Sequence, residues 1–418
     1  MVMSLCWAAL AEAGYLKIVP GLGWFGTFND NLYQSDNAQA QEDLQLGLTP
    51  GLKASYRRPF VEVEDLVRLS LSRYLFDELA EQPSELSLNA SFGGTLAVGL
   101  VNALTFSTTV VPKLELSLRD DLVYQPNRVM LDPSGLEANQ GIVIGAPLDV
   151  PIIDMLDNTL LATANRVFGH SGRMTLDTSY AFRHFEAETP PSGESLEARG
   201  FQDTHRLSCQ PAAEVADPRR KLFYGLSGEV ATVQGYTIST MLLSTSGRIT
   251  FRPGRSMIEF ETGLERISDS VKDSTDYGLR FNLRGEIPLE RDRGRFRYGL
   301  VREMTFLPVF NAYFQRNAVW AEGEVLAHRF TSRNILWVAG GVLLSRVEGD
   351  PLYKVSTGQP SLELRLVVFP ELEAVLGARY VRQWNHADEV SALSVRSFSN
   401  LIVTSSLNYQ FGSLGFPL

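Results

Sequence analysis

Residues 257–265 read MIEFETGLE, and this stretch decides the fold. Apolar residues such as Ile258 and Phe260 alternate there with glutamates such as Glu259. Because successive side chains of a β-strand point to opposite faces, the stretch predicts a strand with one apolar face and one charged face.

The same period of two recurs along the whole chain, for example in 113–119, 277–287 and 362–368. About eighteen such segments follow one another, and many have about ten residues or more, the length that a tilted transmembrane strand needs. Strands of soluble sandwiches are shorter, and a sandwich or propeller would not put charges opposite its aromatic face so regularly. The pattern predicts an all-β chain: a transmembrane antiparallel up-and-down β-barrel of about 18 strands (16–18).

The connections between these segments alternate between short and long. Arg57–Pro59, Gly99–Leu100 and Arg252–Gly254 are short, whereas Asp121–Asn158 is long. Outer-membrane barrels have short periplasmic turns and long extracellular loops, so the alternation favours a barrel over a soluble β-protein. The loop 121–158 is partly apolar, and it is expected either to enter the lumen or to cap the rim.

Composition excludes several classes of protein. The chain has 38 Lys and Arg against 48 Asp and Glu, a net charge of −10, which excludes a general nucleic-acid binder. Two cysteines cannot form a disulfide framework or a four-ligand metal site. No run of eighteen apolar residues is present, so no transmembrane helix is predicted.

The first residues predict a secretory leader. An apolar core from Leu5 to Leu10 precedes Ala11-Glu12-Ala13, which matches the A-x-A cleavage pattern. We therefore expect residues 1–13 to be a signal peptide and 14–418 to form a single outer-membrane barrel domain.

Two stretches resemble a bacterial family. Residues 48–56 (LTPGLKASY), followed by Arg57-Arg58-Pro59 and a charged amphipathic strand, resemble the outer-membrane β-barrel proteins found with exopolysaccharide biosynthesis and export systems. Ser405–Phe411 resembles the terminal strand that the barrel-assembly machinery recognises, although typical barrels end on the aromatic residue and this chain continues to Leu418.

The resemblance implies a location, a function and partners. The location is the outer membrane of a Gram-negative bacterium. The function is passage of a polysaccharide chain across that membrane, and the partners are outer-membrane lipid, the polysaccharide and a periplasmic polysaccharide-export protein.

Motifs for other chemistry are weak. Residues 21–26 (GLGWFG) match G-x-G-x-x-G, but a strand and a loop follow where dinucleotide binding needs a helix. The five histidines have no metal-binding spacing, and no G-x-S-x-G elbow occurs. We therefore predict a non-enzyme without cofactor, metal or catalytic residues.

The charged faces of the predicted strands supply the candidate site. If the apolar faces meet lipid, the charged faces line the lumen and set what passes. Two alternatives to polysaccharide export stay open: a general diffusion porin for small solutes and an outer-membrane barrel enzyme. Each charged residue could equally be a structural ion pair of the wall. The candidate lumen residues are Arg173, Asp177, Arg183, Glu259, Glu261, Arg280, Arg284, Arg295, Arg297, Glu363 and Arg365.

Overall fold

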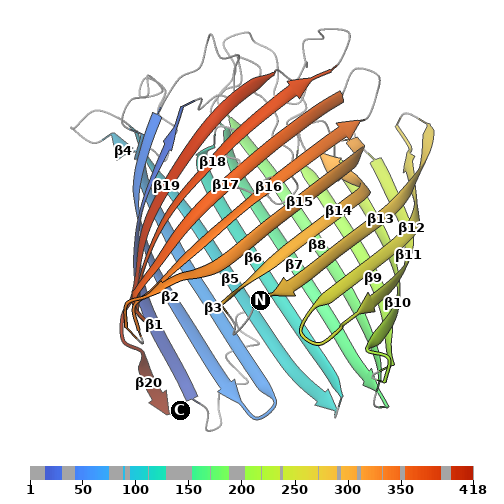
Figure 1. Cartoon of the computed structure of the whole chain (residues 1–418), viewed down its shortest axis with the longest axis horizontal. Coiled ribbons are helices and arrows are strands. Elements are labelled where there is room, and N and C mark those ends of the chain that lie inside the picture. The colour runs from blue at the N-terminus through green and yellow to red at the C-terminus, as the bar shows by residue number, and fades with distance from the viewer. Residues whose placement is uncertain are drawn as a thin grey trace.

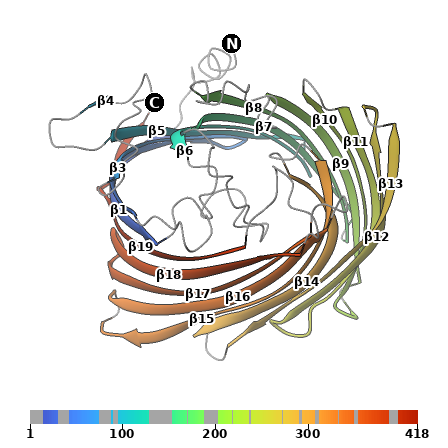
Figure 2. The same cartoon turned by 90° about the horizontal axis from the view of Figure 1, so that it is seen from above.

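Each long strand of the chain pairs antiparallel with the strand that follows it, and the last long strand pairs back with the first (Figures 1 and 2). The computed structural model describes residues 15–30, 43–74, 88–89, 95–111, 113–128, 153–169, 171–187, 203–217, 219–235, 239–271, 273–289, 293–307, 312–331, 333–348, 354–386 and 397–417. In these ranges no helix is long and apolar enough to span a membrane.

The strands follow one another around the wall. Their bounds are β1 Tyr15–Asn29, β2 Asp43–Arg58, β3 Val61–Tyr74, β4 Leu88–Asn89, β5 Thr95–Val111, β6 Leu114–Arg128, β7 Ile153–Phe168, β8 Gly172–Ala187, β9 Thr204–Asp217, β10 Leu222–Gly235, β11 Ser239–Phe251, β12 Met257–Asp269, β13 Ser274–Pro288, β14 Gly294–Leu307, β15 Ala312–Arg329, β16 Ile335–Glu348, β17 Lys354–Phe369, β18 Leu372–Asn385, β19 Phe398–Gln410 and β20 Leu414–Pro417.

Closure of the barrel is made by β1 and β19, where Trp24 lies opposite Leu407. The wall has 18 strands, because the short β4 only extends the edge of β5 and β20 pairs only with the first residues of β1. This confirms the predicted fold class. Beyond Phe411 the chain continues along β1, since the Phe411 N–H bonds to the Pro20 carbonyl at 2.9 Å and Leu414 pairs with Ile18.

The outer face of the wall is mostly apolar. Its exposed side chains include Leu264, Leu279, Leu364 and Leu407, each with a charged or polar residue next to it in sequence that faces the other way. Burying such a band in lipid is the main stabilising contribution available to a barrel whose interior is polar.

Short turns join the strands at one end of the barrel. At 252–256, between β11 and β12, Gly254 has φ +66°, a left-handed conformation that glycine adopts without steric cost. This is the turn predicted from Arg252-Pro253-Gly254. Lys113, directly before β6, has φ +74°.

Two expected boundaries are wrong in the first third of the chain. Gly99–Leu100 is not a turn but lies within β5, and the turn comes instead after Val111. The strands β6 and β7 then reach further than expected and include Asp121 and Asn158, so their connection runs over 129–152. That connection and the expected signal peptide, 1–13, lie outside the described residues.

Candidate functional site

The predicted lumen residues all lie on the inner face of the wall. Each alternates with side chains exposed on the outside: Met174 and Leu176 beside Asp177, or Leu362 and Leu364 beside Glu363. The same alternation places Arg173, Arg183, Glu259, Glu261, Arg280, Arg284, Arg295, Arg297 and Arg365 inside.

Most of these residues are paired with an opposite charge on a neighbouring strand. Arg183 Nη2 lies 2.7 Å from Asp157 Oδ2, directly across the β7–β8 ladder. The same cross-strand arrangement joins Arg284 to Glu259 at 2.5 Å, Arg295 to Glu324 at 3.2 Å and Arg297 to Glu322 at 2.8 Å. Asp177 has no such ion pair among the described residues, and Arg173 donates to Asn165 Oδ1 at 2.7 Å.

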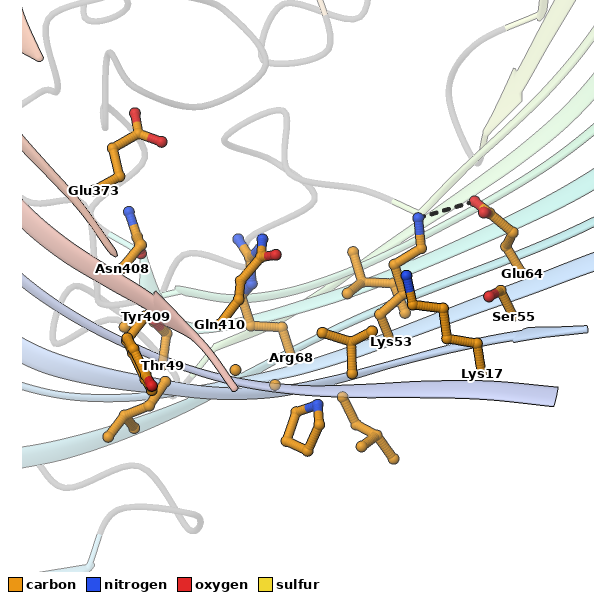
Figure 3. Close-up of a pocket in the computed structure, with 18 of the residues that line it drawn as sticks. Lys17, Thr49, Lys53, Ser55, Glu64, Arg68, Glu373, Asn408, Tyr409 and Gln410 are labelled. Carbon is orange, nitrogen blue, oxygen red and sulfur yellow. Dashed lines mark ion pairs between the residues drawn. The ribbon is translucent and has the colours of Figure 1, made fainter. Parts of the chain in front are cut away.

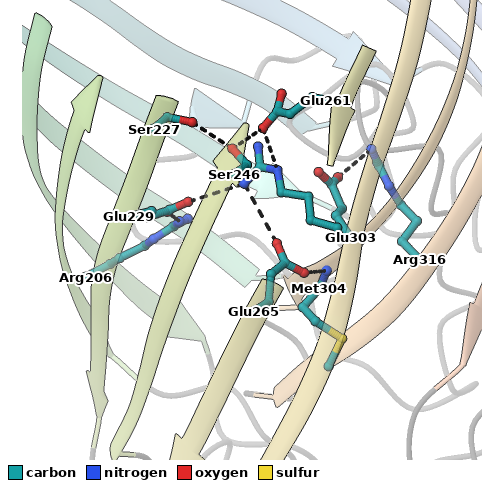
Figure 4. Close-up of polar contacts among 10 residues, drawn as sticks. Arg206, Ser227, Glu229, Ser246, Glu261, Glu265, Glu303, Met304 and Arg316 are labelled. Carbon is teal, nitrogen blue, oxygen red and sulfur yellow. Dashed lines mark hydrogen bonds and ion pairs between the residues drawn. The ribbon is translucent and has the colours of Figure 1, made fainter. Parts of the chain in front are cut away.

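Three glutamates on the inner wall, Glu229, Glu261 and Glu265 (Figure 4), all pair with Arg280. Its Nε lies 3.1 Å from Glu261 Oε1, and its Nη1 lies 3.8 Å from Glu265 Oε1 and 3.9 Å from Glu229 Oε2. Arg206 contributes a second cation, 3.5 Å from Glu229. We call Glu229, Glu261, Glu265, Arg206 and Arg280 the glutamate cluster; its three carboxylates exceed its two guanidinium groups.

Hydrogen bonds from uncharged groups hold the cluster in place. Ser246 Oγ donates to Glu261 Oε1 at 2.7 Å, and the backbone N–H of Met304 donates to Glu265 Oε2 at 2.7 Å. Glu261 and Glu265 are both buried. A carboxylate in so dry a place needs these partners, because burying a charge without them is costly.

A second group of charges lies on β15, β17 and β18 and is more exposed than the cluster. Arg365 lies 3.1 Å from Glu363, 3.4 Å from Glu373 and 3.7 Å from Glu324. Arg365, Glu363 and Glu324 line a recess of about 660 Å³ along β14–β19. The Arg365, Glu363 and Glu373 side chains are 39%, 41% and 42% exposed, so they are more accessible to water and to passing solutes than the buried cluster is.

A third group lies near the short-turn end and was not predicted from the sequence (Figure 3). Lys17, Lys53 and Arg68 from β1–β3 line a recess of about 840 Å³ together with Asn408 and Gln410 of β19. Lys53 pairs with Glu64 at 3.2 Å, while Lys17 and Arg68 form no ion pair within the described ranges. We call this the basic recess.

The basic recess was missed because β1 carries a single charge and its glycines and Pro20 hide the alternation. Its signal was the set of odd-numbered positions Lys17, Gly21 and Gly23, which are small or polar, against the apolar even-numbered ones; Val19 is the exception.

No protein-family model matches the chain, and no curated protein matches it significantly. Solved structures do match. The FrpB iron transporter from Neisseria meningitidis superposes with a TM-score of 0.50 at 6% sequence identity, covering 94% of this chain and 81% of that one. The outer membrane protein opdK from Pseudomonas aeruginosa matches with a TM-score of 0.49 at 10% identity, covering 96% and 99%. OprD from Pseudomonas aeruginosa matches with a TM-score of 0.47 at 10% identity, covering 95% of each chain.

Sequence identities this low establish a shared fold, and they say nothing about which molecules this barrel transports. Three observations together decide the class of protein: the closed wall, its apolar exterior and this shared fold. The chain is an outer-membrane β-barrel. Its location is the outer membrane of a Gram-negative bacterium. The expected resemblance is confirmed at the level of the barrel, and the matched structures do not connect this barrel to exopolysaccharide export.

The inner wall of this outer-membrane barrel carries both positive and negative side chains that could contact a solute.

Within the part of the chain that the structure describes, a catalytic or metal site is not evident beside these charges. Tyr180 Oη and His205 Nδ1 form a 2.7 Å hydrogen bond, but Tyr180 lies on the outer face of the wall, away from the lumen. In the described ranges no group of three His, Cys, Asp or Glu side chains is placed to hold a metal. What the wall provides is a polar, charge-paired surface along the barrel axis.

Proposed function

We propose that this barrel is a water-filled channel through which small hydrophilic solutes cross the outer membrane passively. The observation that carries the proposal is the paired inner wall: arginine and glutamate side chains face the lumen on β7–β18 while the same strands turn leucine and aromatic residues outward. An 18-strand barrel is of the size class that leaves an aqueous channel.

The paired charges suit passage better than tight binding. A guanidinium already neutralised by a neighbouring carboxylate attracts a passing ion weakly, so a solute is held briefly at many places. The basic recess is the exception, because Lys17 and Arg68 have no ion pair there within the described ranges. It supports a modest preference for anionic solutes at the short-turn end.

Liposome swelling tests the proposal. Purified barrel in phospholipid vesicles is challenged with arabinose, glucose, sucrose and maltohexaose, and swelling should be fastest for the smallest sugar. Vesicles with the barrel that swell no faster than protein-free vesicles would refute a channel for small solutes.

Adjacent residues of β19 supply a matched control. Thr404 lines the recess of about 660 Å³, whereas Val403 faces outward. Thr404→Trp should narrow the lumen and slow swelling, and Val403→Trp should leave it unchanged. Equal rates for the two variants would mean that solutes do not pass along this wall.

Polysaccharide export is the second candidate, supported by the resemblance of 48–59 and 405–411 and by the many weak polar contacts of the wall. A deletion strain distinguishes the two functions. Loss of surface polysaccharide with periplasmic synthesis intact would favour export, whereas normal surface polysaccharide and reduced sugar uptake would favour the small-solute channel. A barrel enzyme would instead show turnover of lipid or polysaccharide by the purified protein.

A further inference from the structure

The wall is not paired along its full height between β13 and β14. Their ladder ends at Phe281 opposite Arg302, although β13 continues to Ser274 beside β12 and β14 continues to Leu307 beside β15. The two strands separate above this point (Figure 1). We call the unpaired stretch, 274–280 of β13 against 303–307 of β14, the lateral seam.

A seam of this kind is unusual where a barrel crosses lipid. Open sheet edges do not occur in the hydrocarbon region, because unpaired backbone groups find no water there. The seam lies at the end of the wall away from Leu289 and Gly294, which are joined by a backbone hydrogen bond of 2.8 Å at the short-turn end. In outer-membrane barrels the end away from the short turns is the extracellular one. On its β13 side, Tyr277 and Leu279 are 76% and 58% exposed, so apolar side chains border it on the outside.

The upper part of β14 closes the seam from the inside. The Met304 N–H donates to the carboxylate of Glu265, a side chain on the inner face of β12 (Figure 4). A Cβ built on Gly278 would lie 3.0 Å from Met304 Cγ, so the methionine side chain lies against the inner side of β13. One hydrogen bond to a side chain thus replaces part of the missing ladder.

Apolar residues line the inner wall next to this closure. Ala231, Leu242 and Ile267 are buried together on β10–β12, with Met304 packed against them. They occupy inner-face positions, where the lower parts of the same strands carry Glu229, Ser246 and Glu261. A strip that should be polar for a purely aqueous channel is therefore apolar beside the seam.

We propose that the lateral seam is a side exit through which an amphiphile bearing an acyl chain passes between the lumen and the outer leaflet. The apolar strip of Ala231, Leu242 and Ile267 holds the chain on the inside, and the upper part of β14 is the movable closure. The Glu265–Met304 hydrogen bond is its latch. This route goes beyond the passage of hydrophilic solutes, which follow the barrel axis and do not need the seam.

A disulfide across the seam tests the route. Gly278→Cys and Met304→Cys, in a chain whose natural cysteines are serine, place two sulfurs within bridging reach. The matched control is Ser179→Cys with Ser208→Cys, a β8–β9 pair of the regular ladder whose hydroxyl oxygens lie 2.6 Å apart. A benzophenone amino acid at Leu242 then reports whether tritiated acyl chains of phosphatidylcholine vesicles reach the strip.

The exit predicts cross-linking of lipid at position 242 in the reduced seam variant and its loss after oxidation. Oxidation of the control pair should leave the cross-linking unchanged. Absence of lipid cross-linking in the reduced protein, or cross-linking that survives the seam disulfide, would overturn the proposal. Swelling with arabinose, measured on the same samples, should not respond to the seam disulfide, which keeps this test separate from that of the aqueous channel.

Variants of the latch give a second test that needs no disulfide. Glu265→Ala removes the acceptor for the Met304 N–H and should raise lipid cross-linking at 242 roughly tenfold, the effect of losing a hydrogen bond to a charged group. Glu265→Gln keeps an acceptor oxygen but loses the charge, and its cross-linking should stay closer to the wild-type level than that of the alanine variant. Equal cross-linking in the alanine and glutamine variants would show that this hydrogen bond is not a latch and would overturn the proposed closure.

Discussion

Asn102 Nδ2 donates a 2.9 Å hydrogen bond to Asp65 Oδ1 on the outer face of the barrel, where lipid is the surrounding medium. Both residues take outward positions, since Asp65 shares a face with the exposed Leu69 and Asn102 lies opposite Leu122 in the ladder. Each of these side chains thereby satisfies part of the other's hydrogen-bonding capacity, which lipid cannot do.

The next two strands add one polar residue each to this outer patch. Asp120 of β6 lies between Leu104 and Leu160 of the neighbouring strands, and Asn158 of β7 lies opposite Leu122. Among the described residues neither side chain has a hydrogen bond or ion pair. Two of the four polar side chains of this outer patch are therefore hydrogen-bonded to each other, and the other two, Asp120 and Asn158, should lower the stability of the barrel.

Replacing Asp120 by leucine should therefore stabilise the barrel. The new side chain would meet Leu104 and Leu160, and a lipid-facing charge would be removed. A gain of about 1–2 kcal/mol is expected, below the 2–4 kcal/mol that lipid-facing Arg or Lys cost. Guanidinium unfolding in phospholipid vesicles measures it.

Asp121→Leu is the control for this change. Asp121 faces the lumen, 2.7 Å from Arg119, so leucine there meets water and leaves an arginine unpaired. No gain in stability is expected. A larger gain for Asp121→Leu than for Asp120→Leu would mean that the two faces of β6 are assigned the wrong way round.

This pair of aspartates shows where reasoning from sequence succeeds and where it fails. The alternation in 113–119 predicts the faces of β6 correctly, but two consecutive charges suggest a loop, and the strand in fact continues through them to Arg128. Gly99 suggested a turn for a similar reason, because glycine is common in turns and weak in strands. A tertiary ladder on both sides overrides these local preferences.

Arginine scanning at neighbouring positions of β17 tests the faces directly. Leu364 points outward near the middle of the wall, and Ser361 lines the recess on the inside. Leu364→Arg should cost about 2–4 kcal/mol of unfolding free energy, whereas Ser361→Arg should cost much less because its charge stays hydrated. Equal losses in a urea titration of the reconstituted variants would contradict the assignment.

Two glycines lie under aromatic rings of β14 and differ in one measurable respect. A Cβ on Gly285 would lie 2.3 Å from Tyr298, a clash, whereas one on Gly323 would lie 3.7 Å from Phe296, an ordinary contact. Gly285→Ala should therefore destabilise the barrel by about 1–3 kcal/mol, the cost of overpacking. Gly323→Ala should be neutral or slightly stabilising in the same unfolding assay, and a reversed order would refute the packing described.

The seam and the glutamate cluster differ in how far the sequence predicts them. Glu259 and Glu261 follow from alternation alone, and Arg280 and Arg284 follow likewise. That three strands, β10, β12 and β13, bring Glu229, Glu261 and Glu265 to one arginine depends on the register, which alternation does not specify. The separation of β14 from β13 could not be predicted, because 294–306 keeps its period of two throughout. The apolar inner strip did leave a sign in the sequence, since Ile267 follows Glu259, Glu261 and Glu265 on the same face of β12.

Charge reversal in the basic recess should change ion selectivity. Lys17→Glu with Arg68→Glu removes the two cations that have no ion pair among the described residues, and it leaves the recess acidic. The reversal potential of the channel in a planar bilayer with a KCl gradient should shift toward that of potassium. Lys113→Glu, which changes a charge outside the lumen, should shift the reversal potential little. A comparable shift in this control would show that the basic recess does not set the ion selectivity.

Removing Arg280 should affect both the stability and the selectivity of the barrel, since its guanidinium balances three carboxylates, two of which are buried. In Arg280→Met, Glu229 keeps Arg206, while Glu261 and Glu265 keep only Ser246 and the Met304 N–H as donors. Breaking a buried pair on one side costs about 3–5 kcal/mol, and the negative charge left behind should make the channel more cation-selective.

Arg297→Met is the control, because Arg297 and Glu322 are 38% and 45% exposed and an exposed pair contributes only about 0–1 kcal/mol. Guanidinium titration and reversal potentials of both variants decide the matter, and similar losses in the two would show that the cluster around Arg280 is as hydrated as the open wall.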